Sequence, residues 1–260
     1  MSTPKGLDAV PGTSPHVGTT GRYELILVRH GESQWNRDGR FTGWVDIDLT
    51  AAGKEQARAA GRLLVREGRQ FDLAFTSSLR RSIRSLWLML EELDRVWIPV
   101  ITDWRLNERH YGALTGLDKA AAARVYGDKQ ILEWRRSYTT RPPPLARAAP
   151  YDVATSRCYS QVLPAQLPLT ESLQDTAGRV AAFWNECLAP CIRSGRRVIV
   201  CAHGNSLRAM LKILDDISDS DIMQLNIPNG VPILYRFDAD MRPISRSFLD
   251  LPHDAESNIL

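Results

Sequence analysis

The chain has 260 residues, enough for one sizeable hydrophobic core, and its 43% hydrophobic and 24% charged residues are ordinary for a water-soluble protein. The formal net charge of +3 is too small to indicate binding to nucleic acid, and no apolar run approaches the roughly 18 residues of a membrane span. We therefore expect a cytoplasmic protein with no nucleic-acid or membrane partner.

The two ends of the chain differ in composition from the rest. The first 22 residues contain three prolines and four glycines but no apolar segment of the kind found in secretory signals. We predict that residues 1–22 are a disordered leader, that residues 23–250 form a single folded domain, and that residues 251–260 form a short C-terminal tail.

The first third of the chain alternates between strand and helix patterns. A buried strand is predicted at residues 24–28, a long polar loop at 31–49, a helix from an N-cap at Thr50 to residue 67, a strand at 71–76 and a helix at 79–93. Such a βαβα order is typical of an α/β protein, with a mostly parallel central sheet and helices on both faces.

The second half repeats this pattern after an interruption. Residues 139–168 are rich in proline and arginine and are predicted to be an irregular insertion, either a cover over a site or disordered. A helix at residues 176–191, a strand at 198–202 and a helix at 206–214 are expected to follow.

The four cysteines do not indicate a metal site. Cys187 and Cys191 stand four residues apart on a predicted helix, but no histidine lies nearby at the spacing of a ligand. We interpret them, with Cys158 and Cys201, as buried reduced thiols rather than as a metal-binding pair.

Two predicted strands end in the same way. The first runs into Arg29, His30 and Gly31, and the second into His203 and Gly204. Because ligands of α/β sheets lie outside the carboxyl ends of the strands, the two histidines would face each other if these strands are neighbours. Two imidazoles and a guanidinium suit a phosphoryl group. The alternative is one histidine in the core and one on the surface.

This arrangement would support phosphoryl transfer. A neutral imidazole at His30 is a competent nucleophile and needs no metal. The phosphoryl oxygens need positive charge around them, which Arg29, Arg81 and a protonated His203 could supply. Of the neighbouring Arg80 and Arg81, we expect Arg81 to enter the pocket and Arg80 to lie in solvent.

The departing oxygen needs a proton donor. Glu108 lies in a dense polar cluster, residues 107–112, and burial beside phosphate would favour its protonated form. From the residues alone, an exposed Glu108 paired with Arg109 is an equally good interpretation.

Several motifs extend these observations. They are Arg29-His30-Gly31-Glu32-Ser33-Gln34-Trp35-Asn36, Phe41-Thr42-Gly43-Trp44, residues 106–112, Tyr126-Gly127-Asp128, Trp134-Arg135-Arg136, and residues 168–172, 202–208 and 226–232. In this order, over residues 23–250, the chain closely resembles the cofactor-dependent phosphoglycerate mutases of the histidine phosphatase superfamily.

The resemblance implies a role for each matching residue. His30 would carry the phosphoryl group, Glu108 would donate and accept the proton, and Arg29, Arg81 and His203 would surround the group in transfer. The substrate-binding residues it implies are Gly31, Glu32, Ser33, Gln34, Trp35, Asn36, Thr42, Gly43, Arg109, His110, Tyr111, Lys119, Arg135, Arg136, Gly204 and Asn205.

The activity implied is that of an isomerase. It interconverts 3-phosphoglycerate and 2-phosphoglycerate in glycolysis and gluconeogenesis, by ping-pong transfer through a phosphohistidine at His30. The cofactor would be 2,3-bisphosphoglycerate, which primes the enzyme as the phosphoryl donor, with no metal. The partners would be small phosphorylated three-carbon acids, and the protein would be a homodimer or homotetramer.

Two other functions remain open. One is a histidine phosphatase that hydrolyses small phosphoesters; it would need only the transfer pocket, whereas a mutase also needs cations such as Lys119, Arg135 and Arg136 to hold the far end of a bisphosphate. The other is a non-catalytic anion-binding protein, which would have no use for Glu108. Because the tail at 251–260 is short and lacks lysine, we further expect more phosphatase side activity than in relatives with longer basic tails.

Overall fold

The structure is a computed structural model, in which residues 21–154 and 156–249 are described. They form one six-stranded sheet in the order β3-β2-β4-β1-β5-β6. The strands are β1 (Tyr23–Arg29), β2 (Leu73–Thr76), β3 (Val100–Thr102), β4 (Val198–Ala202), β5 (Pro232–Phe237) and β6 (Pro243–Phe248). The predicted leader lies outside the described residues up to residue 20, and the predicted tail does so entirely.

The sheet is mostly parallel, which confirms the predicted fold class. Strands β3, β2, β4 and β1 run parallel, whereas β5 pairs antiparallel with β1, and β6 with β5. The sequence predicted β1, β2 and β4 from their apolar runs. It missed β3, which has only three residues, and it missed β5 and β6, which both begin at a proline, a residue more typical of turns but tolerated at the first position of a strand.

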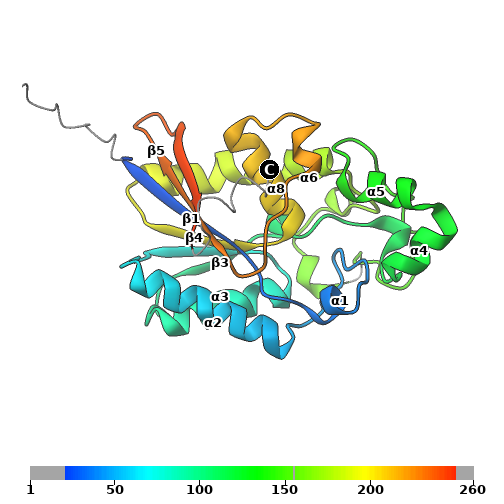
Figure 1. The fold of residues 1–260 in the computed structure, drawn as a ribbon, viewed down its shortest axis with the longest axis horizontal. Coiled ribbons are helices and arrows are strands. Elements are labelled where there is room, and N and C mark those ends of the chain that lie inside the picture. Colours follow the sequence, from blue (N-terminus) through cyan, green and yellow to red (C-terminus); the bar gives the residue numbers. More distant parts are fainter. Residues whose placement is uncertain (1–20, 155, 250–260) are drawn as a thin grey trace, which may run out of the picture.

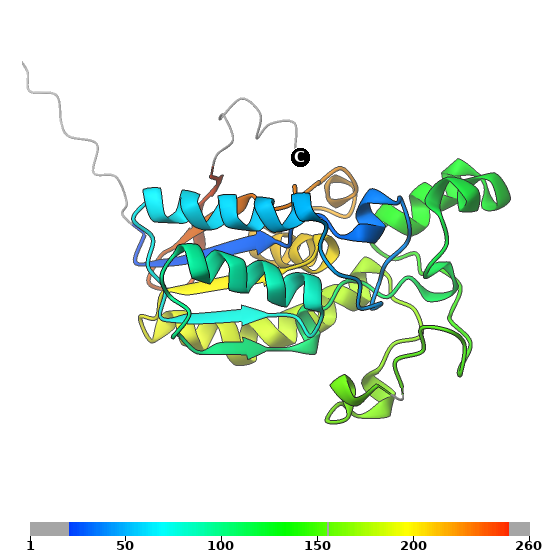
Figure 2. The same ribbon diagram turned by 90° about the horizontal axis from the view of Figure 1, so that it is seen from below.

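Helices cover both faces of the sheet (Figures 1 and 2). The helices are α1 (Gln34–Arg37), α2 (Ala51–Arg66), α3 (Arg80–Glu92), α4 (Lys119–Tyr126), α5 (Asp128–Arg136), α6 (Leu173–Phe183), α7 (Ala189–Arg193) and α8 (Gly204–Asp215). Short 3-10 turns lie at Trp104–Leu106, Gly112–Leu114, Arg157–Tyr159, Pro164–Gln166 and Asp221–Met223. Helices α2 and α3 pack on one face, and α6 and α8 on the other.

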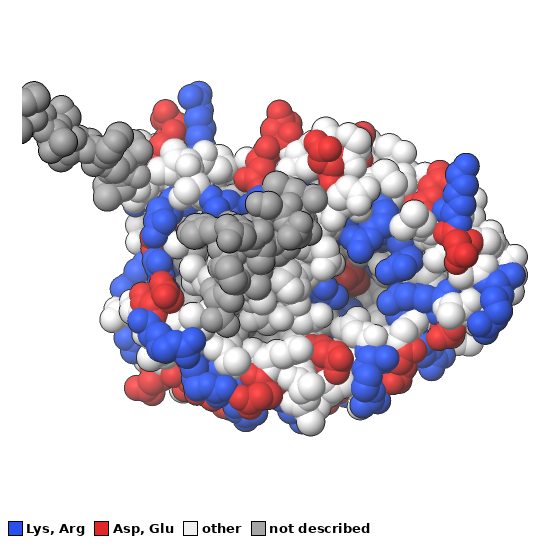
Figure 3. Space-filling view, in the orientation of Figure 1, with Lys and Arg blue, Asp and Glu red and all other residues white. Residues whose placement is uncertain are grey.

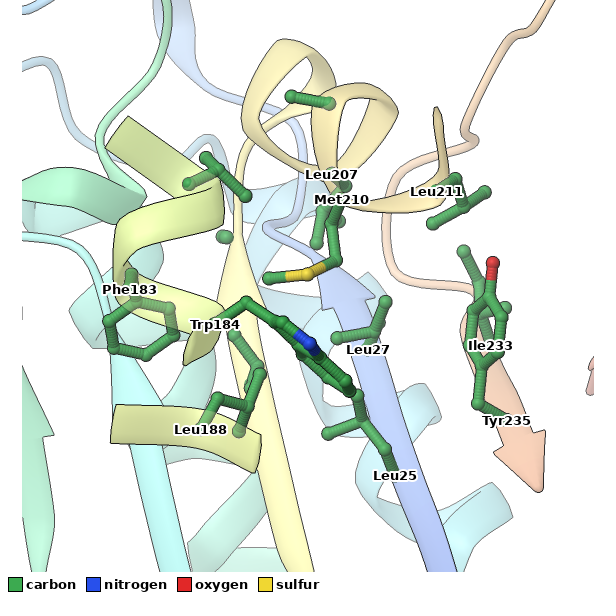
Figure 4. Packing of buried hydrophobic residues seen from close by; sticks show 14 of the residues in the cluster. Leu25, Leu27, Phe183, Trp184, Leu188, Leu207, Met210, Leu211, Ile233 and Tyr235 are labelled. Atoms are coloured by element: carbon green, nitrogen blue, oxygen red, sulfur yellow. The ribbon is translucent and has the colours of Figure 1, made fainter. Parts of the chain in front are cut away.

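The alternation of side chains along β1 divides the core into two layers. Leu25 and Leu27 point towards α6 and α8, where Figure 4 shows them beside Trp184 and Met210. Ile26 and Val28 point to the opposite face, against α2 and α3. A strand buried on both faces therefore reads as the continuous apolar run seen in the sequence.

The structure confirms the predicted start of one helix and differs from the prediction for another. Thr50 caps α2 as predicted, its hydroxyl oxygen accepting a hydrogen bond from the Gly53 N–H at 2.9 Å. The helix predicted at 176–191 is instead α6, a π-helical turn at Trp184–Leu188, and α7. Pro190 has no N–H to donate to the carbonyl four residues earlier, so the regular α-helical ladder cannot continue through this point.

Within residues 139–168, where an irregular insertion is predicted, the described residues form two 3-10 turns but no α-helix or strand. In this insertion, Tyr159 and Leu167 are buried against Trp44, so its described residues pack onto the domain. The prediction for the cysteines was only partly right. All four are free, but Cys158 is exposed, because it lies on the outer side of this insertion, whereas Cys201 is buried in β4.

Candidate active site

The two strand-end histidines meet, as the sequence predicted for neighbouring strands. In the parallel pairing of β1 with β4, Arg29 lies opposite Ala202, so His30 and His203 each follow directly after a paired position. Their rings lie edge to face, with centroids 4.8 Å apart and 64° between the planes. Both are buried, so neither is the surface histidine of the alternative interpretation.

His30 is held as a neutral imidazole with one defined tautomer. Its Nδ1 lies 2.6 Å from the carbonyl oxygen of Gly31, which can only accept, so Nδ1 carries the proton. Burial, together with the charges of Arg81 and Arg29, lowers the pKa of His30 well below its usual value. The lone pair is therefore on Nε2, where a nucleophile for phosphorus is needed.

His203 corrects an expectation from the sequence. Burial and the charges of Arg81 and His30 lower its pKa well below the usual value, so this ligand-free site holds it neutral at pH 7. Its Nε2 lies 2.7 Å from the Ser77 hydroxyl oxygen. The protonated His203 expected above would require an anion in the pocket, because a nearby negative charge favours the imidazolium form.

The two buried arginines are fixed by backbone carbonyls. Arg29 donates to the Ile227 carbonyl at 2.6 Å, and Arg81 donates to the carbonyls of Gly43 and Val45 at 2.8 and 2.9 Å. Burial lowers the pKa of Arg81 to about 10, which leaves it charged at pH 7. As predicted, Arg81 enters the pocket, whereas Arg80 is exposed and donates to Asp46 at 2.9 Å.

Arg29, His30 and Arg81 open into a cavity at the carboxyl ends of the strands, and the residues that line it do not include His203. Figure 3 shows Lys and Arg side chains gathered around a hollow beside α4 and α5. Its lining residues are Arg29, His30, Asn36, Arg40, Phe41, Thr42, Gly43, Arg81, Glu108, Tyr111, Lys119, Arg135, Arg136, Gly204, Asn205, Arg208, Asn226 and Ile227.

Glu108 lies at this cavity and is not the exposed partner of Arg109. One carboxylate oxygen accepts hydrogen bonds from the backbone N–H groups of Arg109 and Asn205, at 2.7 and 3.2 Å. A Cβ on Gly204 would lie 3.5 Å from the Arg29 guanidinium and 3.7 Å from the Glu108 carboxylate, so this glycine lies close to both groups.

A second group of cations lies further from the histidines. Lys119 is the first residue of α4, while Arg135 and Arg136 are the last two of α5. Adjacent residues in mid-helix diverge by about 100°, but at a helix end both reach the cavity. Burial lowers the pKa of Lys119, and burial beside Arg135 lowers that of Arg136.

Several predicted substrate-binding residues do not line the cavity but support it. Gly31, Glu32, Ser33, Gln34, Trp35, Arg109 and His110 belong to this group. The chain enters α1 at Gln34, and among residues 31–36 only Asn36 lines the cavity. Ser33 caps that helix, and the Glu32 carboxylate accepts from the Thr50 hydroxyl at 2.7 Å.

The remaining members of this group brace the second set of cations. Arg109 is fully buried and donates to the Arg135 carbonyl at 2.9 Å. The ring nitrogen Nδ1 of His110 accepts from the Gly112 N–H at 3.0 Å. Neither side chain lines the cavity, and Arg109 keeps two donors, Nε and Nη1, without a partner among the described residues.

The sequence analysis missed five lining residues: Arg40, Phe41, Arg208, Asn226 and Ile227. Arg208 could have been found, because it stands three residues after Asn205 on α8, and its guanidinium donates to the Asn205 side chain at 2.8 Å. Arg40 carried no such local signal. It reaches the cavity by stacking over Trp35, 4.4 Å from the ring centroid.

Buried polar atoms without a partner in the described part of the chain cluster at this site. Among them are Arg29 Nε, Thr42 Oγ1, Arg109 Nε and Nη1, His203 Nδ1 and Arg208 Nε. An unsatisfied buried donor is costly, and a phosphate or carboxylate would supply the missing acceptors. Among the described residues, no group of three or more His, Cys, Asp or Glu side chains could hold a metal ion.

Comparison with known proteins agrees with this geometry. The sequence model of the histidine phosphatase superfamily (branch 1) matches residues 25–247. The chain belongs to this superfamily. Phosphoryl transfer is therefore the general activity of the site. Within the described residues, no helix is long and apolar enough to cross a membrane.

Similar solved structures are phosphatases. Mycobacterial glucosyl-3-phosphoglycerate phosphatase is 24% identical with a TM-score of 0.67, and the alignment covers 88% of this chain and 100% of that one. A putative alpha-ribazole-5'-P phosphatase from Escherichia coli is 22% identical, with a TM-score of 0.63 and coverages of 87% and 94%. The alpha-ribazole phosphatase of Shigella flexneri is 20% identical, with a TM-score of 0.64 and coverages of 88% and 96%.

At these identities the likeness shows the fold alone. The superfamily part of the resemblance is confirmed by the match to the family model. The structural likeness does not extend to the mutase, since the similar structures carry the names of phosphatases.

Proposed function

We propose that this protein is a 2,3-bisphosphoglycerate-dependent phosphoglycerate mutase, which transfers phosphoryl groups through His30. The observation that carries the proposal is the second set of cations, Lys119, Arg135 and Arg136, in the same cavity as His30. A phosphatase needs charge only around the phosphoryl group in transfer. A mutase must also hold the other end of a doubly phosphorylated ligand while that ligand reorients in the site.

The residues divide the chemistry among them. His30 Nε2 forms the bond to phosphorus as the bond from phosphorus to the ester oxygen breaks, and the Glu108 carboxyl gives its proton to that oxygen. Arg29 and Arg81 neutralise the phosphoryl oxygens, and His203 gains a proton as negative charge enters the pocket. In the return step Glu108 takes the proton from the attacking hydroxyl.

The cofactor fits the unsatisfied donors. Arg29 Nε, Thr42 Oγ1 and Arg208 Nε have no partner among the described residues and belong to side chains that line the cavity. Lys119, Arg135, Arg136 and Arg208 would hold the carboxylate and the second phosphate. When bound, 2,3-bisphosphoglycerate supplies the phosphoryl group that charges His30.

A phosphatase is the second candidate, and the comparisons favour it. The similar solved structures are phosphatases, and one of them is named for a substituted phosphoglycerate. Both candidates share the phosphohistidine step and differ in what accepts the phosphoryl group: water in a phosphatase, a substrate hydroxyl in a mutase. The expected phosphatase side activity depends on the short tail at residues 251–260. This tail lies outside the described residues.

A paired assay separates the two. Purified protein is given 3-phosphoglycerate with and without trace 2,3-bisphosphoglycerate, while 2-phosphoglycerate and inorganic phosphate are both followed. Isomer that depends on the bisphosphate, with little phosphate released, supports the mutase. Phosphate without isomer contradicts it and identifies a phosphatase.

We also propose that the protein acts in the cytoplasm without a metal and as a homodimer or homotetramer. One surface supports self-association. On edge strand β3 the Ile101 side chain is 45% exposed, and Trp97, just before the strand, is 70% exposed. Analytical ultracentrifugation showing only monomer at micromolar concentration would contradict the oligomer.

A further inference from the structure

One buried guanidinium has every one of its donors satisfied, three of them by carbonyls of the segment that carries Glu108 and two by Glu171. Arg179, on α6, donates from Nη1 to the carbonyls of Arg105 and Asn107, at 2.6 and 2.8 Å. Its Nη2 donates to the Glu108 carbonyl at 3.1 Å and to Glu171 at 3.0 Å, and its Nε donates to Glu171 at 2.7 Å. These are the five N–H donors that an arginine has.

Glu171 completes the link from the other side. One of its carboxylate oxygens accepts from the His110 N–H at 2.8 Å, in addition to its bonds with Arg179. The side chains of Glu171 and Arg179 are only 5% and 7% exposed. Together the pair binds backbone groups on both sides of Glu108, at residues 105–108 and at 110.

Besides this pair, the segment is held by the Asn107 side chain, which accepts from the Ser78 N–H at 3.0 Å and donates to the Tyr159 hydroxyl at 2.9 Å. The Glu171 N–H also donates to the His110 carbonyl at 2.9 Å. The segment lies between the 3-10 turns at Trp104–Leu106 and Gly112–Leu114, and it pairs with no strand. Its carbonyls point inward, where unpaired backbone groups would be costly. The position of the Glu108 carboxylate therefore depends on the ion pair as well as on its own contacts with Arg109 and Asn205.

Arg179 differs from the arginines at the cavity because it has no donor left to bind a ligand. Arg29, Arg109 and Arg208 keep unsatisfied donors beside the cavity, whereas Arg179 keeps none. Arg179 and Glu171 also neutralise each other and do not line the cavity. Burying such a pair gives little net stability by itself, so a role in positioning explains it better than stability does.

We propose that Arg179 and Glu171 are positioning residues for the proton donor Glu108. The inference rests on the role of Glu108 in the proposed function. Loss of the five hydrogen bonds of Arg179 would let the segment that carries Glu108 shift. A general acid displaced by about 1 Å loses much of its effect. Binding of the phosphoryl group by Arg29 and Arg81 would change little.

The test compares two phosphoryl donors. The leaving group of p-nitrophenyl phosphate is p-nitrophenolate, which departs without a proton. The leaving group of 2,3-bisphosphoglycerate is the alkoxide of phosphoglycerate, which needs a proton. The rate of phosphohistidine formation at His30 is measured with each donor. Arg179→Lys keeps the charge but not the planar fork. We expect it to slow labelling by the bisphosphate about 10- to 100-fold, part of the ~10²–10⁴ typical of general acid catalysis, and labelling by the aryl phosphate less than about threefold.

A double-mutant cycle with Glu108→Gln makes the test specific. If Arg179 acts through Glu108, Arg179→Lys adds little to the defect of Glu108→Gln with the bisphosphate. Effects that multiply, or an equal slowing with both donors, would overturn the inference. Glu171→Gln provides a second variant if Arg179→Lys does not fold, and it should show the same donor selectivity.

The control is a half-buried ion pair at the C-terminal end of α8. Asp215 accepts from Arg246 at 2.5 Å and from the Tyr235 hydroxyl at 2.8 Å, away from the cavity. Asp215→Asn should lower thermal stability without donor selectivity. A wild-type protein that takes label from neither donor refutes the proposed function itself, whereas a labelled wild type with an unselective Arg179→Lys refutes only the positioning role.

Discussion

Gly31 and Gly53 are in direct backbone contact. A Cβ on Gly31 would lie 2.0 Å from the Gly53 carbonyl oxygen, and a Cβ on Gly53 would lie 2.0 Å from the Glu32 carbonyl oxygen. The turn after His30 is thus pressed against the first turn of α2, and neither position has room for a side chain. This contact fixes the Gly31 carbonyl that selects the tautomer of His30.

We predict that Gly53→Ala lowers the free energy of unfolding by about 2–3 kcal/mol, because the clash is with backbone that cannot move aside cheaply. Gly178→Ala is the matched control, since Gly178 lies in α6 with nothing within 4 Å of its added Cβ. That change should be neutral or stabilise by up to about 1 kcal/mol. Urea unfolding of the two variants checks this, and equal effects would contradict the close contact.

His30→Ala should abolish incorporation of acid-labile, alkali-stable phosphate, because it removes the only imidazole that lines the cavity within the described residues. Incubation with labelled 2,3-bisphosphoglycerate followed by peptide mapping is the measurement. In the wild type the label should be on the peptide that contains His30. Label retained in the variant would show that another residue is the acceptor.

Stability should fall as the pH drops below about 6.5, the ordinary pKa of histidine. Burial lowers the pKa of His110 to about 4, and burial with nearby arginines lowers the pKa of His30 and His203. Between these values and 6.5 the unfolded chain binds protons that the native state does not. Each histidine then removes about 1.4 kcal/mol of stability per pH unit, and this contribution is fully present above 6.5.

Urea unfolding between pH 7.5 and 5.5 measures this dependence. Inorganic phosphate should reduce the slope, because an anion beside His203 favours its protonated form in the native state. A stability that does not change over this range would show that the histidines titrate alike in both states.

Arg135→Met should weaken binding of phosphoglycerate while sparing transfer from a donor with a single anionic group. Loss of one charged hydrogen-bonding partner corresponds to roughly a 10- to 100-fold increase in KM. The value of kcat with p-nitrophenyl phosphate should change little, because Arg135 is remote from the histidines. Arg124→Met, exposed on α4, controls for the loss of one positive charge. Equal effects of the two variants would mean that Arg135 does not contact the ligand.

The sequence by itself determined the features that depend on local pattern. Buried apolar runs predicted β1, β2 and β4, and the glycines after His30 and His203 placed both histidines at strand ends. The sequence also placed Arg80 and Arg81 at the carboxyl end of β2, with one of the two expected in the pocket. These predictions succeeded because strand periodicity, caps and turns are properties of a few consecutive residues.

Only the tertiary structure decided how these features act on one another. The register of β1 with β4 brought the two histidines together, and burial beside Arg81 made His203 neutral where the sequence suggested a cation. The hold of Arg179 on the Glu108 loop was invisible in the sequence, because its partners are more than 70 positions away. Burial, charge and hydrogen bonding are set by neighbours in space, and the chain brings those neighbours together only when it folds.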